Sequence, residues 1–326
     1  AQETTFMGIE RSVTGKWWRE RANDERLATT IAQRFGVPEI VGRVMAARGI
    51  DLDDAESFLS PTLRDLMPDP SSLQDMDKAA ARIADAIEKG EKLAVFGDYD
   101  VDGATSTALL KRFFRALGAD VPVHIPDRMT EGYGPNAPAL LALQRNGANL
   151  ILTVDCGVTA YGPLQEAKDA GIEVIVVDHH AAEPELPPAV AVVNPNRLDD
   201  ESGLGHLCAA GVAFLLCVAM LRELRNRGWL EKAGVRAPDL RNWLDLVALG
   251  TVCDVVPLRG LNRAFVTQGI KVMKHRTNIG MTSLADVAGV NETPNAYHLG
   301  YVLGPRVNAG GRVGESFLGT TLLSGE

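Results

Sequence analysis

Runs of apolar residues alternate with helix-forming segments between residues 92 and 193, and this alternation constrains the fold more than any other feature. The runs are Lys92–Phe96, Val121–Ile125, Leu150–Val154 and Glu173–Val177, with a shorter one at 191–193. Runs without polar interruption are typical of strands covered on both faces. Helical segments that end at a glycine separate most of them. We therefore predict an α/β fold: a mostly parallel sheet with helices on both faces.

A different pattern precedes this region. The stretch from Asn23 or Asp24 to Gly36 begins with a capping residue, has apolar residues at helical spacing and stops at a glycine, and a similar stretch follows it. Residues 60–76 contain three prolines, which is typical of an extended connector. We expect residues 1–75 to form a small helical N-terminal region with a connector, and the α/β domain to span 76–305.

Composition limits the partners and the compartment. The net charge is −9, so any contact with nucleic acid requires a local basic region, and residues 206–276 hold eleven Lys and Arg against five Asp and Glu. The four cysteines form no C-x-x-C pair and suit reduced thiols in the cytoplasm. The longest apolar run, Leu207–Leu221, is fifteen residues long and too short to span a bilayer, so we predict no membrane contact.

Acidic residues and histidines follow three of the predicted strands. The first strand leads into the sequence FGDYDVDG, which contains Asp98, Asp100 and Asp102; the third leads into Asp155 and the fourth into the sequence DHH, with His179 and His180. The carboxyl ends of parallel strands meet at one sheet edge, where such sheets bind ligands. Carboxylates gathered there repel one another unless cations neutralise them. We therefore predict a metal site, to which Asp254 adds a further carboxylate.

The spacing in FGDYDVDG also matches the start of a calcium-binding EF-hand loop. That loop requires a glutamate at its twelfth position. Counted from Asp98, this position is Leu109, in an apolar helical segment, and a buried strand precedes the loop in place of a helix. The calcium loop is therefore excluded. Carboxylates with imidazoles favour Mn²⁺ or Mg²⁺, and two such ions suit hydrolysis of a phosphate ester or anhydride.

These motifs together resemble those of the DHH phosphoesterase superfamily, at Asp98–Gly103, Val154–Gly157, Asp178–His180 and Gly250–Asp254. The stretches RGIDLDDAESFLSPTL, IPDRMTEGYG and GPRVNAGGR further resemble the RecJ family of single-strand-specific 5′→3′ DNA exonucleases. The resemblance implies two-metal hydrolysis that releases 5′-mononucleotides from single-stranded DNA, in DNA repair and recombination. It also implies a single-strand-binding protein and a helicase as further partners.

The resemblance also assigns roles. Asp100 and Asp102 would bind metal, and Asp155 would bridge the two ions. His179 and Asp254 would complete one coordination sphere, and Asp98 would be a ligand or would orient one. His180 would contact the scissile phosphate or protonate the leaving oxygen, so the catalytic residues it implies are Asp155, His179 and His180.

Two basic elements are candidate substrate contacts. Arg128 lies in the loop after the second strand, on the metal edge, and the alternative for it is a solvated loop charge. Arg306, Asn308 and Arg312 lie in GPRVNAGGR, where glycines would let a loop approach a ligand and arginines suit bidentate phosphate contact.

Relatives of the resembled family continue past GPRVNAGGR into a second domain. We therefore expect residues 306–326 to begin a linker and the chain to be the catalytic portion of a longer protein. Two other functions stay open: a phosphoesterase acting on pyrophosphate, a short oligonucleotide or a cyclic dinucleotide, and a non-catalytic DNA-binding relative. The polarity of degradation rests wholly on the resemblance.

Overall fold

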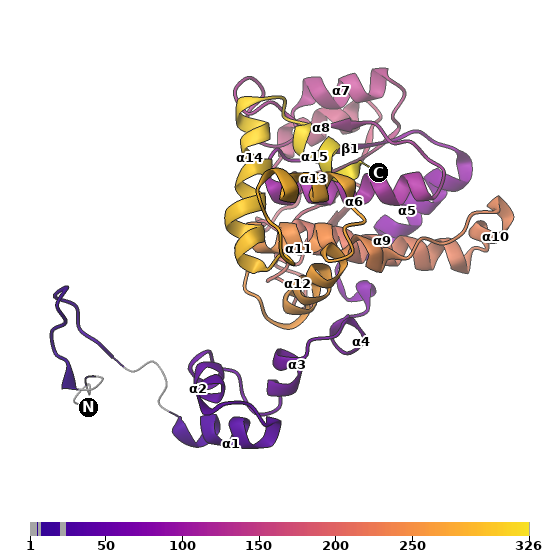
Figure 1. The fold of residues 1–326 in the computed structure, drawn as a ribbon. Coiled ribbons are helices and arrows are strands. Elements are labelled where there is room, and N and C mark those ends of the chain that lie inside the picture. Colours follow the sequence, from indigo (N-terminus) through magenta and orange to yellow (C-terminus); the bar gives the residue numbers. More distant parts are fainter. Residues whose placement is uncertain (1–4, 6–7, 20–23, 326) are drawn as a thin grey trace. The chain divides into compact units, whose positions relative to one another are not determined.

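The computed structural model describes residue 5, residues 8–19 and residues 24–325 (Figure 1). The chain divides into two compact units, one of residues up to Leu66 and one from Met67 onwards. The predicted domain boundaries at residues 75 and 305 stay predictions.

The first unit is helical. It contains α1 (Glu25–Phe35), α2 (Glu39–Ala47), α3 (Ala55–Leu59) and α4 (Leu63–Leu66). Asp24 caps α1 by accepting a 2.8 Å hydrogen bond from the Leu27 N–H, while Asn23 lies outside the described residues. A Cβ at Gly42 would lie 2.2 Å from the Ala28 carbonyl oxygen, so only glycine allows α1 and α2 to cross this closely. This unit confirms the predicted helical region.

The second unit is built on a five-stranded parallel sheet in the order β2-β1-β3-β4-β5. The strands are β1 (Leu93–Phe96), β2 (Val123–His124), β3 (Leu150–Val154), β4 (Glu173–Val177) and β5 (Ala191–Val193). The central strands β1 and β3 are buried along their whole length, as their apolar runs predict. Because all the strand pairs are parallel, the carboxyl ends of the five strands lie at the same edge of the sheet.

Helices cover both faces of this sheet, which confirms the predicted fold class (Figure 1). On one face, α7 (Ala137–Arg145) and α8 (Tyr161–Asp169) close a core with alternate residues of β1, β3 and β4. The other face carries α5 (Met76–Lys89), α6 (Val101–Ala116) and α9 (Ala209–Asn226). None of the described helices combines the length and apolarity needed to cross a membrane.

A further helical layer packs beyond α6 and α9. It contains α11 (Leu244–Cys253), α12 (Gly260–Met273), α13 (Ile279–Val287), the π-helix η4 (His298–Leu303), α14 (Gly304–Val313) and α15 (Leu318–Ser324). Shorter helical turns connect these elements: η2 (Pro70–Ser72), α10 (Trp229–Ala233) and η3 (Leu240–Trp243). The segment GPRVNAGGR is helix α14, so the prediction of a loop there is wrong.

Glycines in α14 serve helix packing, which explains the error. A Cβ at Gly304 would lie 2.4 Å from Cys253 Sγ, and one at Gly311 would lie 2.9 Å from the Tyr99 carbonyl oxygen. Helix α6 begins at Val101. Gly103 therefore lies inside its first turn, and a Cβ there would lie 2.5 Å from the Asp98 carbonyl oxygen.

Candidate metal centre

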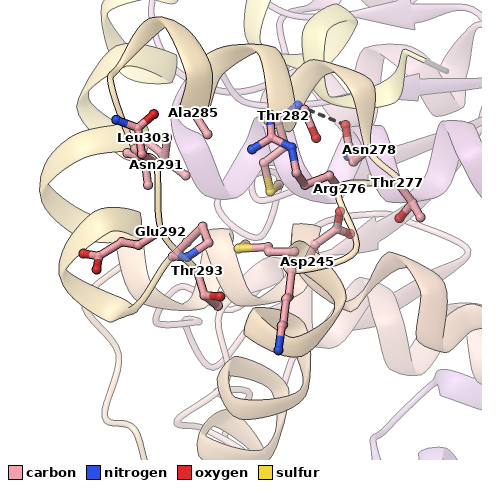
Figure 2. Close-up of a pocket in the computed structure, with 15 residues that line it drawn as sticks. Asp245, Arg276, Thr277, Asn278, Thr282, Ala285, Asn291, Glu292, Thr293 and Leu303 are labelled. Atoms are coloured by element: carbon pink, nitrogen blue, oxygen red, sulfur yellow. Dashed lines mark hydrogen bonds between the residues drawn. The ribbon is translucent and has the colours of Figure 1, made fainter.

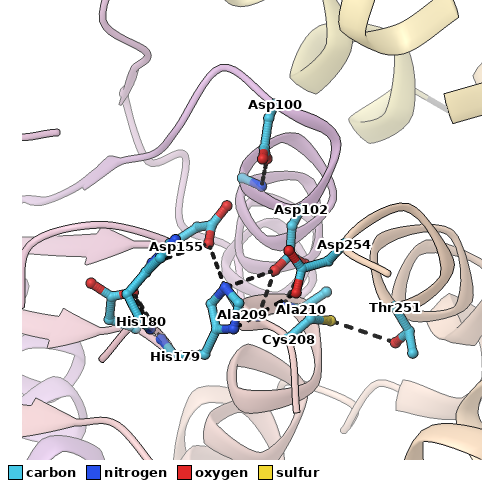
Figure 3. A network of polar contacts seen from close by, with 12 residues as sticks. Asp100, Asp102, Asp155, His179, His180, Cys208, Ala209, Ala210, Thr251 and Asp254 are labelled. Carbon is cyan, nitrogen blue, oxygen red and sulfur yellow. Dashed lines mark hydrogen bonds and ion pairs between the residues drawn. The ribbon is translucent and has the colours of Figure 1, made fainter. Parts of the chain in front are cut away.

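The acidic edge of the sheet is assembled from strand ends and helix ends. Asp98 and Asp100 follow β1, Asp155 follows β3, and His179 and His180 lie just beyond β4. Asp102 lies in the first turn of α6, and Asp254 is the C-cap residue of α11. Figure 3 shows six of these seven side chains around one volume.

Three overlapping groups of side chains could each hold a metal ion. Within each group, the possible ligand atoms lie within 4.8 Å of one another. The groups are Asp98, Asp100 and Asp155; Asp102, His179 and Asp254; and Asp155, His179 and His180. His179 Nε2 lies 3.3 Å from Asp155 Oδ1 and 3.7 Å from Asp102 Oδ2, and its Nδ1 lies 3.7 Å from Asp254 Oδ2. The structure thus brings all seven predicted metal and catalytic residues together.

Backbone N–H groups hold two of the aspartates in place. The carboxylate of Asp102 accepts hydrogen bonds from the N–H groups of Ala209, at 2.6 Å, and Ala210, at 2.9 Å, at the N-terminus of α9. Asp100 caps α6 by accepting from the Gly103 N–H at 2.9 Å. The positive end of a helix dipole favours a carboxylate at each place. Both side chains are therefore oriented before any ligand arrives.

Asp155 occupies a strained backbone position. Its φ of 62° lies in the left-handed region, which residues other than glycine seldom adopt. Its N–H donates to the Val177 carbonyl at 3.0 Å, and its own carbonyl accepts a 3.1 Å hydrogen bond from the Tyr133 hydroxyl. Strain of this kind persists where the surroundings over-determine the geometry, and it concentrates at functional sites.

Asp178 is a site residue to which the sequence analysis gave no role. Its Oδ1 accepts from the N–H groups of His179 and His180 and lies 2.7 Å from His180 Nδ1, while its Oδ2 accepts from the Val158 N–H. Burial by itself would raise the pKa of Asp178, but the hydrogen bonds to His180 and the backbone hold it below its ordinary value. The hydrogen bond with Asp178 raises the pKa of His180. The available signal was its position as the first residue after β4.

Burial and mutual repulsion disfavour the charged form of the other carboxylates. Burial first, and the neighbouring aspartates second, raise the pKa of Asp98 to about 7 and that of Asp102 to about 8. The same two causes raise the pKa of Asp155 well above its usual range and that of Asp254 to about 6. Burial lowers the pKa of His179. Bound cations would reverse these costs, since they favour charged carboxylates and neutral imidazole.

Unpartnered buried atoms test whether a metal fits. Asp98 Oδ1, Asp155 Oδ1 and His179 Nε2 are buried without a hydrogen-bond partner. Buried polar atoms normally have one, and all three of these residues belong to the candidate ligand groups. Burial raises the pKa of the nearby Cys156, Cys208 and Cys253 thiols, and no cysteine belongs to the candidate ligand groups. The donor set is therefore carboxylate oxygen and imidazole nitrogen, which suits a hard divalent cation.

The predicted substrate contacts separate into two groups. The Arg128 guanidinium lies 5.5 Å from the ring centroid of Tyr99, and Gly311 packs against the Tyr99 backbone, which places Arg312 nearby. Asn308 precedes Arg312 by four residues and shares its helix face. Arg306 lies on a different face, where its Nη1 donates to the Val302 carbonyl at 2.7 Å. Arg306 therefore does not join Arg128 at Tyr99.

A cavity of about 220 Å³ lies apart from this centre (Figure 2). Asp245, Arg276 and Asn278 are among its lining residues, and none of the predicted site residues is. Asp245 is in the first turn of α11, whereas Asp254 caps the other end. At 1.5 Å per residue the two lie roughly 13 Å apart along the helix.

Comparison with known proteins agrees with this geometry. The model of the DHH family, N-terminal domain, matches residues 92–251. The chain is 38% identical to the single-stranded-DNA-specific exonuclease RecJ of Salmonella typhimurium, over 88% of this chain and 50% of that protein. It is 35% identical to RecJ of Bacillus subtilis, over 95% of this chain and 38% of that protein. The chain thus spans half the length, or less, of these relatives.

Solved structures show the same likeness. A crystal structure of exonuclease RecJ bound to manganese matches with a TM-score of 0.66 and 38% identity, covering 79% of this chain and 62% of that one. RecJ of Thermus thermophilus in complex with Mn²⁺ matches with a TM-score of 0.73 and 32% identity, covering 92% of this chain and 41% of that one.

Proposed function

We propose that this chain belongs to the DHH family and is the metal-dependent catalytic part of an exonuclease that hydrolyses single-stranded DNA. One observation carries the proposal: Asp98, Asp155 and His179 each have a buried polar atom without a hydrogen-bond partner. These atoms lie at the sheet edge where seven acidic and imidazole side chains converge. The identity with RecJ proteins over most of this chain supports the substrate class.

The proposed ligands are the predicted ones, for two divalent cations, Mn²⁺ or Mg²⁺: Asp98, Asp100, Asp102, Asp155, His179 and Asp254. Asp155 and His179 each belong to two of the three groups, which suits residues between two ions. The unpartnered Oδ1 of Asp98 favours a ligand role for that residue. When bound, such ions activate water and neutralise charge on a phosphate.

The side chains around the ions would handle the substrate. Because Asp178 holds His180 Nδ1, the Nε2 of His180 is left for the scissile phosphate or the leaving oxygen. The raised pKa of His180 favours the protonated ring, in which Nε2 donates. Arg128, Asn308 and Arg312 would bind phosphates beside Tyr99, and Arg306 would do so farther along. The alternative for Arg128, a solvated loop charge, predicts no effect of its removal on affinity.

Several finer proposals rest on the resemblance alone. These are the 5′→3′ direction, release of 5′-mononucleotides, action in DNA repair and recombination, a cytoplasmic location, and a single-strand-binding protein and a helicase as partners. They apply to the longer proteins that this chain matches in part.

A degradation assay tests the proposal. Single strands and duplexes labelled at either end are incubated with the chain and Mn²⁺, and release of label is followed over time. We expect Mn²⁺-dependent loss of the 5′ label from single strands only. Asp155→Ala should abolish release while the circular dichroism spectrum stays unchanged, and Asp169→Ala, at an exposed position of α8, should act as wild type. Hydrolysis by a metal-replete Asp155→Ala protein, or of pyrophosphate in place of DNA, would contradict the proposal.

A further inference from the structure

Two stacked tyrosines lie on the surface at the π-helix η4. The ring centroids of Tyr297 and Tyr301 are 5.3 Å apart, with an angle of 25° between the ring planes. The two residues are 62% and 74% exposed. The rings thus cover one face of each other and leave their outer faces to solvent. Paired aromatic rings held in this way present a flat apolar surface of defined orientation.

The local sequence fixes this orientation. Leu299 and Leu303 are fully buried. Between and beside them, glycines let η4 approach α11: a Cβ at Gly300 would lie 3.3 Å from Val252 Cγ1, and one at Gly304 would lie 2.4 Å from Cys253 Sγ. The inner face of the segment is therefore leucine and glycine, and the tyrosines can only point outwards. Short π-helical segments inside helices are frequently associated with functional sites.

The segment that carries the pair packs on the helix that ends at Asp254. The Cys253 thiol donates to the Leu299 carbonyl at 3.4 Å, and the residue that follows Cys253 is the candidate ligand Asp254. Segment η4 thus packs on the last turn of the helix that delivers Asp254.

The charged side chains nearest the pair in sequence are Arg306 and Glu292. Residues 293–314 contain no Asp or Glu, and Glu292 Oε1 lies 3.5 Å from His298 Nε2. The bond from Arg306 Nη1 to the Val302 carbonyl, 2.7 Å long, places the guanidinium over the turn next to Tyr301. Flat apolar rings beside a guanidinium suit a ligand with exposed planar bases and a phosphate backbone. A duplex does not offer the faces of its bases, whereas a single strand does.

We propose that Tyr297 and Tyr301 are a base-stacking platform for a single-stranded nucleic acid, with Arg306 as its phosphate contact. That this strand is also the substrate of the metal centre rests on the proposed function. The platform binds nucleotides some way along the strand from the one at the metals, so it contributes to affinity for longer strands and leaves the hydrolytic centre unchanged.

Binding without hydrolysis tests the platform separately from the activity. Fluorescence anisotropy of a labelled twelve-nucleotide oligothymidylate is measured in EDTA for wild type, Tyr301→Ala, Tyr297→Ala/Tyr301→Ala and the matching Phe variants. Base–aromatic stacking contributes about 1–3 kcal/mol per base, so each lost ring should weaken the Kd about fivefold or more. The Phe variants should bind as wild type does. Val287→Ala removes a side chain of similar exposure (85%) on α13 and should change nothing.

A dinucleotide is too short to reach the platform. Its hydrolysis in the presence of Mn²⁺ should therefore be equally fast in wild type and Tyr301→Ala. Unchanged oligothymidylate affinity in folded Ala variants, equal weakening by Val287→Ala, or no binding by wild type would overturn the proposal. A changed sedimentation coefficient with unchanged DNA affinity would identify a contact between protein copies and also overturn it. If wild type binds the strand through these rings but hydrolyses no DNA, the platform stands and the proposed function fails.

Discussion

The hydroxyl of Tyr133 donates a 3.1 Å hydrogen bond to the backbone carbonyl of Asp155, the residue shared by two of the three candidate ligand groups. Asp155 has a φ of 62°, so this bond supports a strained peptide as well as a ligand. The tyrosine comes from the loop after β2 and connects that loop to the end of β3.

Tyr133→Phe keeps the ring and removes this bond. We expect the affinity for Mn²⁺ to fall about tenfold, because residues that orient metal ligands typically affect affinity by 10–100-fold. Isothermal titration with Mn²⁺ measures this. Tyr161→Phe is the matched control, since the Tyr161 hydroxyl also donates to a backbone carbonyl, that of Glu185 at 2.8 Å, away from the predicted ligands. Equal affinities for both variants and wild type would exclude the positioning role of Tyr133.

Metal removal should make stability depend on pH. The pKa of Asp98 is raised to about 7 and that of Asp102 to about 8, so both bind protons more tightly in the folded chain than in the unfolded one. Their contribution is fully present near pH 4 and is lost as the pH rises through 7 to 8. In EDTA, the melting temperature of the wild-type chain should fall between pH 5 and pH 8.5. This fall should exceed that of Asp98→Asn by on the order of 5 °C.

Saturating Mn²⁺ should reduce or reverse this dependence, because the cation favours the charged carboxylates. Differential scanning calorimetry with and without metal measures both effects. A metal-free chain that grows more stable over that pH range would show that these carboxylates are not held in the protonated form.

Asp178→Asn should lower kcat for DNA hydrolysis without weakening metal binding. The variant loses the negative charge beside His180 Nδ1, which lies 2.7 Å from Asp178 Oδ1, and puts an NH2 group in place of one of the two oxygens that accept backbone N–H groups. We expect roughly a 10–100-fold loss of kcat. The double variant with His180→Ala should be no slower than His180→Ala alone, because the two residues act as a unit. Additive losses would show that Asp178 acts independently of His180.

Two adjacent glycines of α14 offer a matched pair. A Cβ at Gly311 would lie 2.9 Å from the Tyr99 carbonyl oxygen, whereas the nearest atom to one at Gly310 would be Leu318 Cβ, at an ordinary 3.6 Å. Gly311→Ala should destabilise the chain by about 1–3 kcal/mol. Gly310→Ala should stabilise it by about 0.5–1 kcal/mol, since alanine is the better helix former. Urea unfolding measures both, and effects of the same sign would contradict the packing of α14 on Tyr99.

The sequence predicted the sheet and the location of the centre because both follow from simple rules. Fully apolar runs mark buried parallel strands, and parallel strands bring Asp98, Asp155 and His179 to one edge by topology alone. The topology of the sheet does not place Asp254, since it follows a helix and its position depends on how α11 packs.

Tertiary packing explains the rest. Three glycines in GPRVNAGGR suggested a loop, but Gly304 and Gly311 are small because other elements approach them closely. The helix that results places Arg306 on a different face from Asn308 and Arg312, which a loop would not have required. Tyr297 and Tyr301 are part of no recognisable sequence motif. The sequence did not predict the stacked pair, because the exposure of the two rings depends on which face of η4 is buried.

The candidate ligands extend from residue 98 to residue 254 and belong to elements that meet only when the sheet and α11 are assembled. No short stretch of the chain holds enough of them to bind an ion tightly by itself. A partly folded chain therefore has little cation affinity. The ion in turn selects the completed fold, so cation binding and the last long-range contacts of the chain depend on each other.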